Sequence, residues 1–187
     1  MTLPPALDGE RLEFDGLSCY VAGDGPPLLL VHSVNAAASA AEVRPLFDHW
    51  RATRTVFAID LPGYGFSDRS DRDYSPRLMT DALHAVAAQI RKRCGAAPLD
   101  ALALSLSCEF LARAAAEQPA HWGQLALVSP TGQSRRARRL HRLPRHGHRA
   151  EQAQLAHELA GPPQGRIPEC AARSTSERVP DRGAAVF

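Results

Sequence analysis

The sequence predicts an α/β fold in which a mostly parallel sheet carries helices on both of its faces. Between residues 28 and 128, short apolar runs bounded by turn residues alternate with amphipathic segments of helical period. Continuously apolar runs are typical of strands that are buried on both faces of a parallel sheet. The chain has 187 residues, of which 44% are hydrophobic, and this is enough for one domain with a sizeable core.

The first half of the predicted domain begins with a hairpin, because Asp15-Gly16 strongly favours a two-residue hairpin turn. A helix is predicted further along, where Ser39 and Glu42 have the spacing of a capping box. In order, this half is predicted to form a hairpin within residues 11–22, a strand at Leu28–His32, a helix with Val43, Leu46, Phe47 and Trp50 on one face, and a strand at Thr55–Asp60.

The second half contains the clearest helix of the sequence. Ser75 is placed to be its N-cap and Pro76 its first residue, and basic residues followed by Gly95 close it. Its apolar stripe at helical spacing is assigned to the core and not to a cofactor site. In order, the remaining predictions are a strand at Leu99–Leu104, a helix at Leu106–Glu117 that Pro119 stops, and a strand at Leu125–Val128.

The residues that follow each predicted strand are the candidates for chemistry, because ligands bind beyond the carboxyl ends of the strands in open parallel sheets. One of these residues, Ser105, lies between a strand and a helix with no loop to spare. Such a serine either stands on a sharp turn with its hydroxyl projecting as a nucleophile, or simply caps the helix. Ala103 and Ser107 are small, as the sharp turn requires, although neither is the glycine of the G-x-S-x-G pattern.

Four motifs in a fixed order give residues 28–132 a resemblance to the α/β-hydrolase family. The most specific is the D-x-P-G-x-G-x-S turn at Asp60–Ser67, which fixes a proline and two glycines at once. The others are the strand end Leu29–Ser33, the serine turn Ala103–Ser107, and the strand end Leu125–Pro130. The resemblance implies the first part of a hydrolase fold, so the predicted fold is an incomplete one.

The resemblance also implies site residues. Ser105 would be the nucleophile, and the backbone N–H groups of Leu106 and Val34 would form the oxyanion hole. Ser33 stands where the family usually has glycine. His32 is expected to be structural, bonded to neighbouring loops.

A further structural role is predicted for Asp60. Its spacing to Pro62 and Gly63 is typical of an Asx-type turn, in which the carboxylate fixes the backbone that follows it.

The chain changes character after the predicted domain, which spans residues 1–132. Residues 134–187 contain 11 arginines and five acidic residues, a net charge of +6, and only eight residues that are Leu, Ile, Val or Phe. We expect 133–187 to be a poorly ordered Arg/Pro-rich tail. We interpret it as the product of a frameshift or truncation of a longer hydrolase gene.

The catalytic base and acid of the family would lie in this tail, since they follow the serine in the chain order serine, acid, histidine. His148 is the candidate base, because Gly147-His148 followed by Glu151 is faintly similar to the family's Gly-His segment. The alternative is a solvated histidine in a basic tail. For the acid, the sequence does not distinguish Glu151, Glu158 and Asp181.

Two function classes remain. The first is a serine hydrolase that acts on a small carboxylic ester or related acyl substrate and is impaired in this chain. The second is a non-catalytic truncated remnant or an interaction module. No cofactor or metal is expected, because the four cysteines lack ligand spacing. We also expect a cytoplasmic location, no membrane or nucleic-acid partner, and self-association through the apolar sheet edge at residues 125–128.

Overall fold

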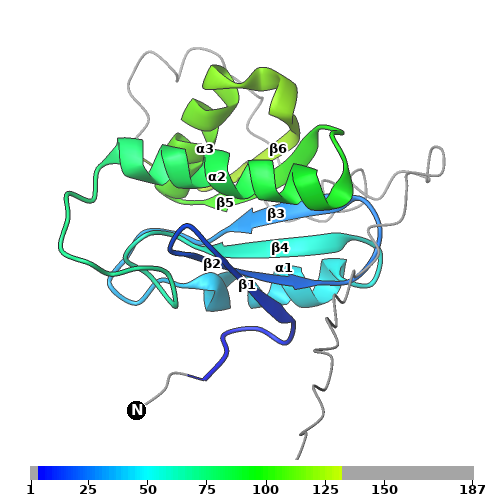
Figure 1. Ribbon diagram of the computed structural model, residues 1–187, viewed down its shortest axis with the longest axis horizontal. Helices are drawn as coiled ribbons and strands as arrows, with labels where there is room; N and C mark the ends of the chain where they lie inside the picture. Colours follow the sequence, from blue (N-terminus) through cyan, green and yellow to red (C-terminus); the bar gives the residue numbers. More distant parts are fainter. Residues whose placement is uncertain (1–3, 132–187) are drawn as a thin grey trace, which may run out of the picture.

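The computed structural model describes residues 4–131, which form a six-stranded sheet with helices on both faces (Figure 1). This confirms the α/β class predicted from the sequence. The strand order is β1-β2-β4-β3-β5-β6. The strands are β1 (Glu10–Phe14), β2 (Leu17–Ala22), β3 (Pro27–Val31), β4 (Thr55–Asp60), β5 (Leu99–Leu104) and β6 (Trp122–Val128), and the helices are α1 (Arg44–Trp50), α2 (Pro76–Cys94) and α3 (Ser107–Glu117), with 3₁₀ turns η1 (Ala40–Val43) and η2 (Pro119–His121).

Four of the strands are parallel. β3 runs parallel to β4 and β5, and β5 runs parallel to β6, whereas β1 and β2 form the predicted antiparallel hairpin. Asp15 and Gly16 at its turn have φ values of 48° and 73°, the two positive values that a type I′ turn requires. The carboxyl ends of the parallel strands meet at one end of the sheet, on the left of Figure 1, where the long β4–α2 loop also lies.

The core has two layers, one on each face of the sheet. Side chains alternate along β4, so that Phe57 and Ile59 pack in the cluster that includes α2 and α3, whereas Val56 and Ala58 pack in the cluster that includes η1 and α1. Every residue of β4 is buried. The continuously apolar run that predicted this strand therefore reflects burial on both faces.

The capping box predicted for the helix before Trp50 forms only in part. The Ser39 hydroxyl accepts a hydrogen bond from the Ala41 N–H at 3.3 Å, but the Glu42 carboxylate binds a different loop, so the second half of that prediction is wrong. The segment is also divided into η1 and α1. Pro45 explains the division, because a residue without an N–H fits only the first turn of a helix.

The other elements follow the predictions closely. The hydroxyl of Ser75 caps α2 by accepting from the Leu78 N–H at 3.3 Å, and Gly95 ends the helix with a φ of 102°. β6 begins three residues earlier than predicted, because Trp122 already pairs with Leu99. An irregularity in the ladder follows this pair, and there the Asp100 carboxylate accepts from the Gln124 N–H at 2.8 Å.

Several predictions fall outside residues 4–131. They are the boundary at 132, the tail at 133–187, and the candidates His148, Glu151, Glu158 and Asp181. Across the described part of the chain, none of the helices has the length and apolar character needed to span a membrane.

Candidate active site

Ser105 stands on a strained turn between β5 and α3. Its φ of 53° lies in the left-handed region, which costs a residue with a Cβ about 1–3 kcal/mol. The end of β6 and the loop after it hold this conformation: the Ser105 N–H donates to the Val128 carbonyl at 2.9 Å, and the Ser105 carbonyl accepts from the Thr131 N–H at 3.3 Å. Ser105 does not cap α3, since Leu106 is the N-cap residue and no side chain makes a cap hydrogen bond there.

The two small residues beside this turn have different roles. Ala103 is fully buried in the sheet. Ser107 is buried too, and its hydroxyl donates to the His32 carbonyl at 2.6 Å, which ties the start of α3 to the loop after β3. A serine in place of glycine thus supplies a cross-link that glycine could not make.

The hydroxyl of Ser105 is partly exposed and has one hydrogen-bond partner among residues 4–131. That partner is the Thr131 hydroxyl, with 3.3 Å between the two oxygens. Ser129, which begins the loop that carries Thr131, is also left-handed, with a φ of 49°. The contact between these two hydroxyls could not be predicted from local sequence patterns, because Ser105 and Thr131 are 26 residues apart.

Two backbone N–H groups that follow the carboxyl ends of β3 and β5 have no hydrogen-bond acceptor among the described residues. One belongs to Leu106, at the positive end of the 11-residue helix α3, and the other to Val34, in the loop after β3. Their side chains both pack against the core cluster on the α2 and α3 face. These are the two N–H groups that the sequence predicted to form an oxyanion hole, and that role stays a prediction.

The loop that carries Val34 is fixed by the Glu42 carboxylate. Ser33 donates to it twice, from its N–H at 2.8 Å and from its hydroxyl at 3.0 Å, and the Asn35 amide donates to it at 2.7 Å. Partial burial raises the pKa of Glu42, but these hydrogen bonds outweigh it and hold that pKa below its usual value. Glu42 was predicted to be a helix cap, and it instead positions this loop.

His32 is fully buried, and both of its ring nitrogens are hydrogen-bonded. Nδ1 lies 2.5 Å from the Ser33 carbonyl, and Nε2 accepts from the Leu61 N–H at 3.0 Å, which together define a neutral ring with its proton on Nδ1. Burial lowers the pKa of this imidazole. The predicted structural role is confirmed, since neither nitrogen is open to take a proton from Ser105.

Asp60 holds the β4–α2 loop, but not through the Asx-type turn predicted for it. One carboxylate oxygen accepts from the Ala40 N–H at 2.8 Å and the other from the Phe66 N–H at 3.0 Å. The Asx geometry is impossible because the residue two positions on is Pro62, which has no N–H. Gly65 is required here, since a Cβ on it would lie 2.1 Å from Cγ of Asp60.

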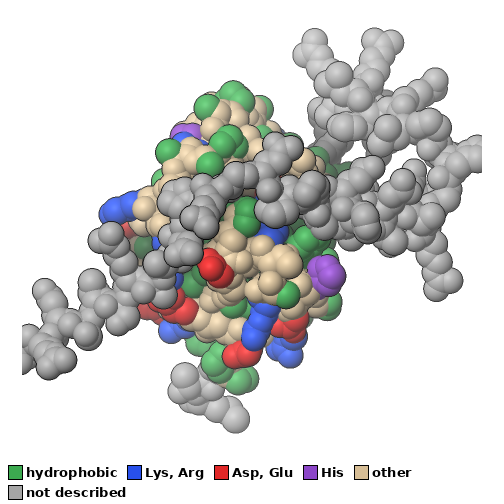
Figure 2. All heavy atoms as spheres, turned by 90° about the vertical axis from the view of Figure 1, so that its right-hand side faces the viewer, with side chains coloured by type: hydrophobic (Ala, Val, Ile, Leu, Met, Phe, Trp, Pro, Cys, Tyr) green, Lys and Arg blue, Asp and Glu red, His purple; other side chains and the backbone are tan. Residues whose placement is uncertain are grey.

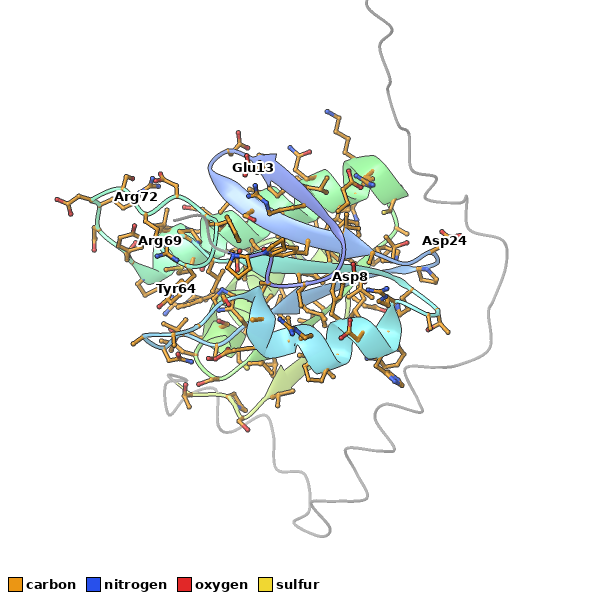
Figure 3. All side chains as sticks on the ribbon, turned by 90° about the horizontal axis from the view of Figure 1, so that it is seen from below. Asp8, Glu13, Asp24, Tyr64, Arg69 and Arg72 are labelled. Atoms are coloured by element: carbon orange, nitrogen blue, oxygen red, sulfur yellow. The ribbon has the colours of Figure 1, made fainter. Side chains whose placement is uncertain are left out.

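The same loop carries Tyr64 to the end of the sheet at which Ser105 lies. Figure 3 shows Tyr64, Arg69 and Arg72 on this loop and Asp24 at the opposite end of the molecule. The Tyr64 ring meets His32 edge-on at 5.2 Å between centroids. The opposite end of the molecule faces the viewer in Figure 2, and where grey atoms do not cover it, acidic and basic side chains lie next to each other.

Ser105 lies apart from the cavity at the β1–β2 hairpin, and the described residues form no metal site. Within residues 4–131, no three His, Cys, Asp or Glu side chains are grouped to hold a metal ion. A cavity of about 380 Å³ lies between the β1–β2 hairpin and α2, with Cys19, Phe57 and Ile90 among its lining residues, and none of the residues around Ser105 lines it.

Comparison with known proteins agrees with this architecture. The sequence model of the alpha/beta hydrolase fold matches residues 26–165, which is most of the chain. This chain belongs to the alpha/beta hydrolase fold family. The family resemblance found in the sequence is therefore confirmed, and the match continues past the last described residue.

Individual members of the hydrolase family share only part of their length with this chain. It is 31% identical over 109 residues to pimeloyl-(acyl-carrier protein) methyl ester esterase of Xylella fastidiosa, which covers 58% of this chain and 38% of that esterase. A serine hydrolase involved in carbazole degradation has a similar fold, with a TM-score of 0.60, 18% identity, and coverage of 68% of this chain and 49% of that one. An alpha/beta hydrolase fold protein from Burkholderia ambifaria gives a TM-score of 0.57 at 25% identity, and the match covers 82% of this chain and 53% of that one. The chain thus spans about half of these two structures.

Proposed function

We propose that this member of the hydrolase family cleaves a small carboxylic ester or related acyl substrate through a covalent intermediate on Ser105. The observation that carries the proposal is the left-handed backbone of Ser105, whose φ of 53° is held by the end of β6. Strain of this kind persists where the surrounding structure enforces it, and it clusters at active sites. The esterase among the relatives supports an ester as the substrate class.

The proposed reaction follows from the donors and acceptors around Ser105. Its Oγ attacks the carbonyl carbon while its proton passes to a base, and the carbonyl oxygen becomes an oxyanion that receives the N–H groups of Leu106 and Val34. Collapse of this intermediate expels the alcohol, which takes up the proton, and leaves an acyl group on Ser105. Water then attacks that ester with the same proton transfers in reverse.

The rate of ester hydrolysis by this chain depends on the base that accepts the proton of Ser105. His148 is the candidate, and it lies outside the described residues, while His32 has both nitrogens engaged. Loss of the histidine from such a triad lowers turnover on the order of 10⁶-fold, although the remaining groups keep roughly 10³–10⁴ over water. We propose that turnover in this chain is impaired to this extent. We also propose a cytoplasmic location, which the buried thiols of Cys19 and Cys108 support.

A fluorophosphonate probe and a short-chain chromogenic ester test the proposal. We expect the native chain to be labelled and to hydrolyse the ester slowly, and Ser105→Ala to lose both activities. Ser70→Ala, which removes an exposed serine of the β4–α2 loop, is the matched control and should be labelled like the native chain. If the native chain and Ser105→Ala behave alike, the non-catalytic alternative replaces the proposal.

A further inference from the structure

The two edges of the sheet differ in chemical character. β1, at one edge, carries Glu10, Arg11 and Glu13 within five residues, whereas β6, at the other edge, has the sequence WGQLALV and no charged residue. Within residues 4–131, β6 pairs with β5 on one side and with no strand on the other. Charged side chains are a common protection of sheet edges against pairing with another chain, and β6 lacks it.

The apolar surface beside β6 is also incompletely covered. Leu125 and Leu127 are half-buried against the cluster on the α2 and α3 face, and Val128 is 37% exposed. On the other face, η1 and α1 lie over β3 and β4 (Figure 1), and Leu102 of β5 remains partly exposed. Trp122 is buried and anchors the start of the strand, so β6 is a fixed edge.

We infer that β6 pairs with β6 of a second copy of this chain, antiparallel and about a two-fold axis at Ala126. With the axis at Ala126, Leu125 of one copy lies opposite Leu127 of the other, and Gln124 lies opposite Val128. Side chains that lie opposite each other on antiparallel strands point to the same face of the sheet. No charges meet across this pairing, because the strand has none. Five residues of each strand are paired, over about 17 Å at 3.4 Å per residue.

A second copy suits this edge better than the remaining part of the same chain. Residues 134–187 offer eight Leu, Ile, Val or Phe residues among 54 positions and carry 11 arginines against five acidic residues. An extra strand beside β6 needs apolar side chains at alternate positions to cover Leu125 and Leu127. β6 itself provides that pattern, and a strand that pairs with its own copy closes the assembly at a dimer.

Charge substitutions at the proposed axis test the pairing. Ala126 is only partly buried, so Ala126→Glu and Ala126→Lys are compatible with the monomer fold. In the dimer each variant places two like charges opposite each other, and we expect the dimer dissociation constant to rise about tenfold or more. An equimolar mixture of the two variants pairs Glu with Lys and should dimerise again, which a misfolded variant could not do.

Sedimentation velocity of the full chain over a range of concentrations measures the proportions of monomer and dimer. Glu13→Lys, on the opposite edge, is the control and should dimerise like the native chain, and so should Ser105→Ala, because the pairing does not depend on the proposed hydrolysis. A native chain that is monomeric at every concentration overturns the inference, and so do variants that dimerise as the native chain does. If the native chain is monomeric but Ala126→Glu lowers its melting temperature by several degrees, residues 132–187 cover the edge instead.

Discussion

The strain at Ser105 predicts that glycine stabilises the chain at this position relative to alanine. Alanine keeps the Cβ that conflicts with a φ of 53°, whereas glycine adopts this conformation freely. Relief of the strain is worth about 1–2 kcal/mol. The greater freedom of glycine in the unfolded chain reduces this gain by about 0.4–1 kcal/mol. The free energy of unfolding of Ser105→Gly should therefore exceed that of Ser105→Ala by about 0.5–1 kcal/mol.

Both variants remove the hydroxyl that contacts Thr131, so the difference between their stabilities reports the conflict between the Cβ and the backbone conformation. Urea denaturation gives the free energies of unfolding, and the melting temperatures of the two variants should differ by about 1–4 °C. Ala116→Gly, at an exposed position of α3, is the control. Its free energy of unfolding should fall by about 0.5–1 kcal/mol, because glycine weakens a helix. If Ser105→Gly is less stable than Ser105→Ala, as at the control position, Ser105 is not strained and the main support for its catalytic role is removed.

Three further predictions concern the loops around Ser105. Gly65→Ala should cost about 3 kcal/mol in urea denaturation, because the new Cβ would lie 2.1 Å from Cγ of Asp60 at a φ of 49°. Ser107→Ala leaves the buried His32 carbonyl without its donor at 2.6 Å, and we expect a loss of about 1–3 kcal/mol in the same assay. The pKa of Glu42 is lower in the folded chain than its ordinary 4.5, so its contribution to stability is present above that value and is lost as the pH falls through the folded pKa. Glu42→Gln should therefore make melting temperatures less dependent on pH in the acid range.

The structural elements that local signals specify were predicted well. Asp15-Gly16 forms the expected hairpin turn, and Ser75 with Pro76 begins α2, because in both cases the deciding contacts lie within a few residues. The roles of Glu42 and Thr131 depend on partners 9 and 26 residues away, which no local pattern contains. A tertiary contact thus outweighed the capping box.

The wrong prediction of an Asx-type turn at Asp60 has another cause, because the sequence itself excludes that turn. An Asx-type turn needs the N–H of the residue two positions on, and that residue is Pro62. The spacing of the motif predicted that the carboxylate fixes a turn. The hydrogen-bonding capacity of each residue would have excluded the local form of that turn and indicated the partners across the loop, Ala40 and Phe66.

The groups that hold Ser105 in its strained conformation all lie within the described residues, whereas the candidate base does not. Val128 and Thr131 bind its backbone, and Glu42 fixes the loop that offers the Val34 N–H. None of these contacts involves His148, so under the proposed function we expect a chain without a functional base to keep the arrangement around Ser105. Such a site should still bind an analogue of the tetrahedral intermediate, since the oxyanion donors act without proton transfer. Binding of a boronic acid that Ser105→Ala abolishes, measured by calorimetry alongside slow ester hydrolysis, would separate an intact site from a missing base. Absence of binding in the native chain would show that the site itself is not formed.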